Sequence, residues 1–409
     1  MNLQLQEADL RYSHAPSADK KATGLSPLTA LIFAAACGLS VANVYFAHPL
    51  LDAIAHDFSI DPASVGVVVT VTQIGYALGL FFIVPLGDLF NRRKLIAGQA
   101  VLSALALILV GVSPNAAVLL ASLAAVGLLA VVVQVLVAYA ADLALPEERG
   151  RAVGTVTSGV ILGILLARFV SGLVADFAGW RSVYLVSAAL TLVMAAILFR
   201  VLPRHEAMRP RTSYPKLLVS VLRLFVEEPL LRVRAVLAMM IFASFNILWA
   251  PLVLPLAAPP FSLSHTEIGL FGLAGVAGAL GARWTGVLID RGQGQLVTGL
   301  SLSLMAAAWL PIAFMGKTLW LLVLGILMLD LAIQAVHVTN QSLIFARRPD
   351  ARSRLVGGYM VFYSLGSALG SIASTMTYGA WGWSGVCLLG AGTGLAALAF
   401  WVLTTRVGR

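Results

Sequence analysis

The chain contains twelve apolar runs, each long enough to cross a lipid bilayer as a helix. A membrane-spanning helix needs about 20 mostly apolar residues, and charged residues make up only 11% of these 409 residues, against about one quarter in soluble domains. The sequence therefore predicts an all-α membrane protein with twelve spanning helices. The expected spans are 27–51, 63–87, 94–112, 116–142, 152–176, 182–202, 235–257, 266–288, 296–314, 318–345, 355–379 and 384–404.

Basic residues indicate how these helices are oriented. Placing both termini in the cytoplasm puts all 27 Lys and Arg residues in cytoplasmic segments or at their helix ends, except Arg168, Arg181, Arg283 and Lys317. This bias follows the positive-inside rule. The basic residues form short clusters between apolar runs, so the net charge of +9 does not indicate a nucleic-acid partner. Residues 1–25 lack the apolar core of a signal peptide. We expect a multi-pass protein of the bacterial inner membrane or a plasma membrane.

The predicted helices fall into two groups of six. We expect a cytoplasmic tail over 1–26, a first six-helix bundle over 27–202, a cytoplasmic linker over 203–234 and a second bundle over 235–405. The linker segment PKLLVSVLRLF is amphipathic, which predicts either a helix on the membrane surface or a plain connection.

An internal repeat relates the two groups. PEERGRAVG at 146–154 matches PDARSRLVG at 349–357, an offset of 349 − 146 = 203 positions, and the same offset takes Gly163 to Gly366 and Gly179-Trp180 to Gly382-Trp383. Because six helices is an even number, both copies have the same orientation, which predicts a parallel repeat about an axis along the membrane normal.

The first inner loop of each half carries a charged motif. VPLGDLFNRRK contains Asp88, Arg92 and Arg93, and the second copy, GVLIDRG, contains Asp290 and Arg291. With the twelve spans and the repeat, these loops resemble those of the major facilitator superfamily, in which the pattern is Gly-x-x-x-Asp-Arg-x-Gly-Arg-Arg. Val84, Leu89 and Asn91 depart from that pattern.

The resemblance implies transport by two rocking bundles, by a monomer without a cofactor. It also implies an inner-side gating cluster of Asp88, Arg92, Arg93 and Asp142, with Asp290 and Arg291 in the second copy. PEERGRAVG and the Gly-rich fifth helix are similar to the bacterial drug- and sugar-efflux branch, which contains proton antiporters. Antiporters of that branch usually have Gly-Pro in the fifth helix, where this chain has Ala167-Arg168, so the direction of transport stays open.

The tenth helix carries a polar stripe. Asp330, Gln334, His337 and Gln341 follow i, i+4, i+7 and i+11 spacing and so lie on one helix face. An ionisable group at the bilayer centre costs at least about 2.5–3.5 kcal/mol, so this face should point to a central cavity. Asp330 and His337 are the predicted proton carriers. The alternative is structural, with Asp330 bonded to a neighbouring helix and His337 a satisfied core residue.

Arg168 is the other charge expected deep in the membrane. It is predicted either to pair with a carboxylate or substrate anion, or to extend to the membrane surface. If it meets Asp330, a proton on Asp330 would release Arg168 and act as a switch.

Amides and aromatic residues on helices that line the cavity in the resembling family are the candidate substrate contacts. Amides can hydrogen-bond a polar solute or join helices, and aromatic rings can stack on a solute or only pack. The predicted substrate contacts are Asn43, Tyr45, Gln134, Asn246, Trp249, Gln334, Gln341 and Tyr363.

These observations favour a secondary transporter that exports a small amphipathic organic compound against protons. Proton-linked uptake of a small metabolite, including an anion recruited by Arg168, is the alternative within transport, and a membrane ligand sensor is the alternative of another class. Gly-x-Ser-x-Gly, His-Glu-x-x-His and P-loop motifs are absent, so the sequence does not indicate an enzyme or an ATP-driven pump. Cys37 and Cys387 show no spacing typical of a metal site, and no metal is expected.

Overall fold

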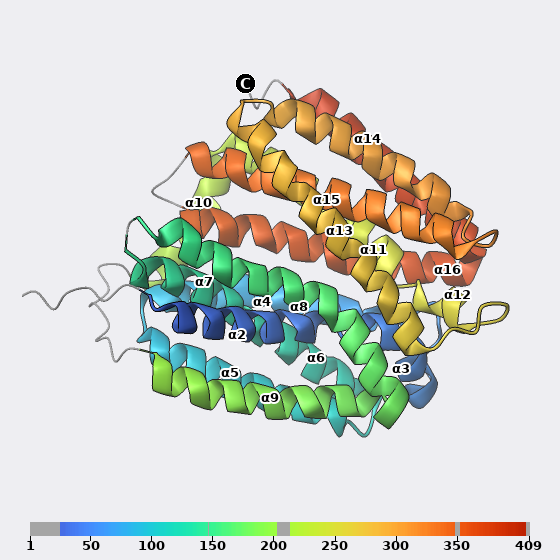
Figure 1. Ribbon diagram of the computed structural model, residues 1–409, viewed down its shortest axis with the longest axis horizontal. Coiled ribbons are helices and arrows are strands. Elements are labelled where there is room, and N and C mark those ends of the chain that lie inside the picture. The colour runs from blue at the N-terminus through green and yellow to red at the C-terminus, as the bar shows by residue number, and fades with distance from the viewer. Residues whose placement is uncertain (1–24, 146, 203–212, 348–351, 406–409) are drawn as a thin grey trace, which may run out of the picture.

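The computed structural model describes residues 25–145, 147–202, 213–347 and 352–405, and every regular element within these ranges is a helix (Figure 1). The first half contains α2 (Pro27–Tyr45), η1 (His48–Leu50), α3 (Leu51–Phe58), α4 (Val67–Phe82), η2 (Val84–Asp88), α5 (Arg92–Gly111), α6 (Ala116–Ala130), α7 (Val132–Leu143), α8 (Arg149–Ala178) and α9 (Trp180–Val201).

The second half begins with α10, which covers most of the amphipathic segment of the predicted linker. It contains α10 (Tyr214–Glu227), α11 (Pro229–Trp249), α12 (Val253–Ala257), α13 (His265–Asp290), α14 (Gly294–Ala313), α15 (Leu319–Arg347) and α16 (Arg352–Thr404).

The twelve-helix prediction is confirmed. Ten segments of the described chain are long and apolar enough to span a membrane. The last of them, Arg354–Thr404, contains two spans, because Gly382 has φ 62° and interrupts the helical backbone. Helix α13 supplies the remaining span.

Two glycines at equivalent places in the repeat have the same unusual backbone. Gly179 joins α8 to α9 with φ 81°, and Gly382 divides α16 with φ 62°. Positive φ is accessible to glycine without the steric penalty that a Cβ imposes. The Gly-Trp pair found in the sequence repeat thus marks the same sharp corner between two spanning helices in each half.

The halves also repeat a close helix contact. A Cβ added at Gly163 on α8 would collide with the backbone of Gly38 on α2, and a Cβ added at Gly366 on α16 would collide with the backbone of Met239 on α11. Small residues let membrane helices approach closely and gain dispersion energy. The glycines therefore hold α8 against α2 and α16 against α11.

We expect Gly163→Ala to destabilise the protein by about 1–3 kcal/mol, because the new methyl group must displace backbone. Gly154→Ala is the matched control on the same helix, since a Cβ there meets nothing within 4 Å. Thermal unfolding of both variants in detergent measures the difference. Equal melting temperatures for the two variants would show that the α2–α8 contact is not tight.

The two halves meet most closely at one end of the molecule. Figure 1 shows α3 and α12 at this end, which we call the far end, and α10 at the opposite end, which we call the tail end. Across the halves, α4 packs on α16 and α8 packs on α13. The glycine contacts lie near the far end, where Gly66 abuts Ser371 and Gly379 abuts Ala63.

Candidate functional site

A cavity of about 220 Å³ lies between the two halves. Its walls are mainly aliphatic and aromatic, from α2, α4, α7 and α8 on one side and α11, α13, α15 and α16 on the other. Its polar lining comes from both halves: Tyr45, Gln73, Tyr76, Gln134, Thr157 and Arg168 from the first, and Asp330, Gln334, His337, Gln341 and Tyr363 from the second.

Asp330 lies on the cavity wall and is only 6% exposed. Among the described residues, its Oδ1 has no hydrogen-bond partner. The indole N–H of Trp249 lies near the carboxyl group without meeting the geometry of a hydrogen bond. A side chain at Gly275 of α13 would collide with Oδ2. The carboxyl group is thus enclosed but incompletely bonded, as a group that exchanges a proton requires.

The rest of the predicted stripe on α15 also faces the cavity. His337 Nδ1 lies 3.0 Å from the Tyr359 hydroxyl, and Gln341 Nε2 lies 3.4 Å from His337 Nε2. Both ring nitrogens of His337 therefore have partners, on α15 and α16. This favours the structural alternative for His337 more than the incomplete bonding of Asp330 favours the structural alternative for Asp330.

Arg168 is 2% exposed and is packed among aromatic rings instead of extending to the surface. Its guanidinium carbon lies 3.9 Å from the ring centre of Trp249 and about equally far, 5.2 Å and 5.4 Å, from those of Phe245 and Tyr45. Cation–π contacts of this kind are worth about 2 kcal/mol when desolvated. Within the described part of the chain, Nε and Nη2 have no hydrogen-bond partner.

Arg168 and Asp330 share the cavity without forming a direct ion pair. They attract each other electrostatically, but among the described residues no salt bridge within 4.0 Å joins them. Two opposite charges in one low-dielectric space stabilise each other even at this separation. Both side chains line the same cavity.

Gln73 is a cavity residue that the sequence interpretation missed. It is fully buried on α4, and neither polar atom of its amide has a hydrogen-bond partner among the residues that the structure describes. A buried amide without partners costs about 1–3 kcal/mol, so it is suited to bind water or a solute. An amide inside the apolar run VVVTVTQIGYALG was the available signal. Gln134 is half-satisfied, with Nε2 donating to the Tyr76 hydroxyl at 3.4 Å.

Three predicted substrate contacts, Asn43, Asn246 and Trp249, are not among the residues that line the cavity. Asn43 Oδ1 accepts a hydrogen bond from Ser187 at 2.6 Å, within the first half. Asn246 Oδ1 lies 3.2 Å from His48 Nε2 and 3.3 Å from Ser371 Oγ. Both amides join helices, and Trp249 stacks on Arg168. The amide oxygens of Asn43 and Asn246, which were expected to meet a solute, are therefore hydrogen-bonded within the protein.

Tyrosine hydroxyls and a second histidine join the halves near the cavity. The hydroxyls of Tyr45 and Tyr363 bond to each other across the interface. His48, which the sequence interpretation also missed, bonds the Tyr45 carbonyl through Nδ1 at 3.1 Å and Asn246 through Nε2. The Tyr45–Tyr363 and His48–Asn246 bonds therefore connect the two halves.

The predicted gating residues lie at the tail end. Arg92 forms a salt bridge with Asp142, and its Nε donates to the Gly87 carbonyl at 3.0 Å. Arg93 donates to the Phe199 carbonyl from Nε at 2.8 Å. These contacts tie α5 to α7, η2 and α9 of the first half. Arg291 is exposed, and the side chains of Asp88 and Asp290 lie outside the described part of the chain.

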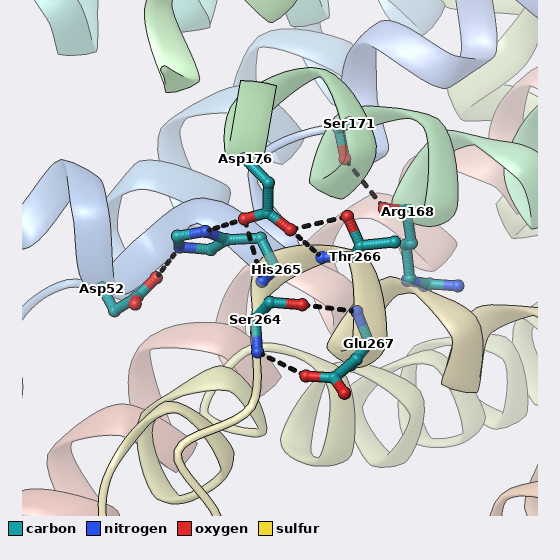
Figure 2. Close-up of polar contacts among 8 residues, drawn as sticks. All are labelled: Asp52, Arg168, Ser171, Asp176, Ser264, His265, Thr266 and Glu267. Atoms are coloured by element: carbon teal, nitrogen blue, oxygen red, sulfur yellow. Dashed lines mark hydrogen bonds and ion pairs between the residues drawn. The ribbon is translucent and has the colours of Figure 1, made fainter. Parts of the chain in front are cut away.

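A further charged cluster closes the far end (Figure 2). His265, the first residue of α13, lies between Asp52 of α3 and Asp176 of α8. It lies just outside the expected span 266–288. The hydrogen bond to Asp52, with the charges of Asp52 and Asp176, raises the pKa of His265 to about 9 against the effect of burial.

Known proteins resemble the whole chain. The model of the Major Facilitator Superfamily matches residues 30–349 and 235–409. The uncharacterized transporter YgaY of Escherichia coli O157:H7 is 47% identical over 377 residues, covering 92% of this chain and 95% of that protein. Among solved structures, the nucleoside transporter NupG has a TM-score of 0.75 at 14% identity, covering 91% of this chain and 98% of that one. A bacterial homologue of the lysosomal transporter Spinster has a TM-score of 0.72 at 16% identity, covering 92% and 96%.

Proposed function

We propose, from the premise that the chain belongs to the major facilitator superfamily, that it moves a small organic compound by alternating access and couples that movement to protons through Asp330. Like its relatives, the chain is a membrane transporter and not an enzyme. In alternating access, two bundles rock about a site between them, so that the site opens to one side of the membrane at a time.

The observation that carries the proton coupling is the incomplete bonding of Arg168 and Asp330 in one cavity. With Asp330 ionised, the two charges balance, and the empty cavity is neutral. A proton on Asp330 and a cationic or hydrogen-bond-donating group of a solute compete for the same carboxylate, and this exclusion is what antiport requires. A proton on Asp330 also leaves the guanidinium without its counter-charge, which favours an anionic solute and symport. Proton and solute occupancy are linked in both cases.

Export of an amphipathic compound at the bacterial inner membrane is the direction we propose, with the tail end in the cytoplasm. The distribution of basic residues supports this orientation, and the resemblance of PEERGRAVG to the efflux branch supports the direction. The mixed lining of the cavity, apolar with a few amides and hydroxyls, suits a compound with both kinds of surface.

A second candidate is proton-linked uptake of an organic anion, and the unpaired guanidinium of Arg168 favours it. An anion bound beside Arg168 and a protonated Asp330 leaves the loaded cavity neutral, as the empty cavity with ionised Asp330 is. A carrier that is neutral in both states avoids moving net charge through the low-dielectric interior, and this arrangement gives symport.

Proteoliposomes with an internal pH dye test both candidates. A panel of cationic, neutral and anionic amphipathic compounds is added outside the vesicles without an imposed voltage. Antiport predicts that an inward compound gradient drives protons out, and symport predicts that it drives them in. Compounds that bind without moving protons in either direction would contradict proton coupling and bring the sensor alternative forward.

A further inference from the structure

The far-end cluster joins three segments that are remote in the sequence. His265 Nε2 lies 3.1 Å from Asp52 Oδ1, and His265 Nδ1 lies 2.9 Å from Asp176 Oδ1. Both carboxylates belong to the first half, and the imidazole belongs to the second. The three side chains are 28%, 26% and 25% exposed, so protons reach them directly from solvent. The contact that spans the two halves is therefore ionisable and accessible.

Asp176 also caps α13 from the opposite half. Its carboxylate accepts hydrogen bonds from the backbone N–H groups of His265 at 3.2 Å and Thr266 at 2.8 Å, and from the Thr266 hydroxyl at 2.6 Å (Figure 2). Ser264 and Glu267 form a capping box that satisfies the next N–H group. The first N–H groups of a helix have no partner within it, and its positive end attracts an anion.

The crossing of α8 and α13 places this cluster and Arg168 on one surface. Arg168, Gly172 and Asp176 are four residues apart on α8 and share a face. Added Cβ atoms at Gly172 and Gly269 would collide with the backbones of His265 and Arg168 respectively. Separation of α13 from α8 at the far end must therefore break the bonds of Asp176 and uncover the backbone beside Arg168.

We propose that Asp52, His265 and Asp176 form a proton-operated lock that holds the far end closed. A protonated imidazole bridges two carboxylates and binds the halves together. When the proton leaves to the solvent, the two carboxylates face a neutral ring, and one of the two hydrogen bonds loses its donor. Two other ionisable residues lie nearby: Glu267 on α13 accepts from the backbone N–H of Ser264, and His56 lies one turn from Asp52 on α3. This lock is separate from Asp330 and goes beyond the proposed function.

The pH dependence follows from the raised pKa of His265. In the closed state this pKa is about 9, and separation from both carboxylates returns it toward the ordinary value of about 6.5. The added stability of the closed state is thus fully present below about pH 6.5 and is lost as the pH rises through about 9. The full shift corresponds to about 300-fold in the closing equilibrium, and solvent screening reduces this to an expected effect of about tenfold or more.

Distances between spin labels at the far end measure this equilibrium without a substrate. Labels at Ser64→Cys and Lys317→Cys, both exposed, report on one half each. Cys37→Ala and Cys387→Ala remove the two natural thiols. Between about pH 6 and about pH 9.5, we expect the distance distribution to gain a longer component at the expense of the short one.

His265→Gln should show the longer component at both pH values, and Asp52→Asn should weaken the pH dependence. His56→Gln, an exposed histidine on the same helix as Asp52, is the matched control and should behave as the parent does. A pH response that survives in both His265→Gln and Asp52→Asn, or that is missing from the parent, would overturn the proposal. Because no compound is added, failure here is distinct from failure of proton-coupled transport.

Discussion

Asp330→Asn is expected to abolish compound-driven proton movement in proteoliposomes while compound binding persists. The amide keeps the shape of a protonated carboxyl group but cannot release a proton. The affinity for the compound should therefore lose its pH dependence, which in coupled systems typically amounts to about 5- to 150-fold. Calorimetric titration at several pH values measures the affinity, and the internal pH dye measures the flux.

The control for this variant is Glu147→Gln, which removes an exposed carboxylate from the loop before α8. It should leave both the flux and the pH dependence of binding unchanged. If Asp330→Asn retains proton movement at the parent rate, another group carries the proton, and His337 is the next residue to test because it lines the same cavity.

Arg168→Gln is expected to weaken the binding of anionic compounds by about 10- to 100-fold, the equivalent of a charge-assisted hydrogen bond of about 1.5–3 kcal/mol. Neutral compounds of the same size should lose much less. Arg168→Lys should recover only part of the affinity, because an ammonium group lacks the planar surface that stacks on Trp249. Binding of matched acid and amide pairs to each variant gives the comparison.

Arg181→Gln is the control for Arg168→Gln, since Arg181 is a partly exposed arginine paired with Asp57 outside the cavity. The double variant Arg168→Gln with Asp330→Asn should be more stable than Arg168→Gln alone, because removing one buried charge leaves the other uncompensated at a cost of about 3–5 kcal/mol. An additive effect of the two substitutions on thermal stability would show that the charges do not interact, and uniform loss of affinity for acids and amides would remove Arg168 from anion recognition.

The arrangement of spanning helices could be predicted from the sequence, because each helix satisfies its own backbone hydrogen bonds and can be recognised from the length of its apolar run. The start of the seventh span could not. It was placed at residue 235 because Arg232 and Arg234 look like loop residues, whereas α11 begins at Pro229. Arg234 is buried inside the second half, where it donates to Thr298 at 3.2 Å and Asn340 at 3.1 Å.

Part of the candidate site could likewise be predicted from the sequence, and part could not. The stripe from Asp330 to Gln341 was predictable, since its members lie on one helix and periodicity alone sets their common face. The hydrogen bonds of Asn43 and Asn246 could not be predicted, because their partners, Ser187 and His48, come from other helices. The cluster around His265 was missed because it has no local pattern: its members come from three segments that only the packing of the two halves brings together.

The cap that Asp176 provides to α13 gives the far end an all-or-none character. Four donors, two of the backbone and two of side chains, converge on this single carboxylate. An outward movement of α8 would lengthen all four bonds at once, because all of them end on one side chain. The first N–H groups of α13 would then depend on water for their partners, so the four bonds are made and lost together.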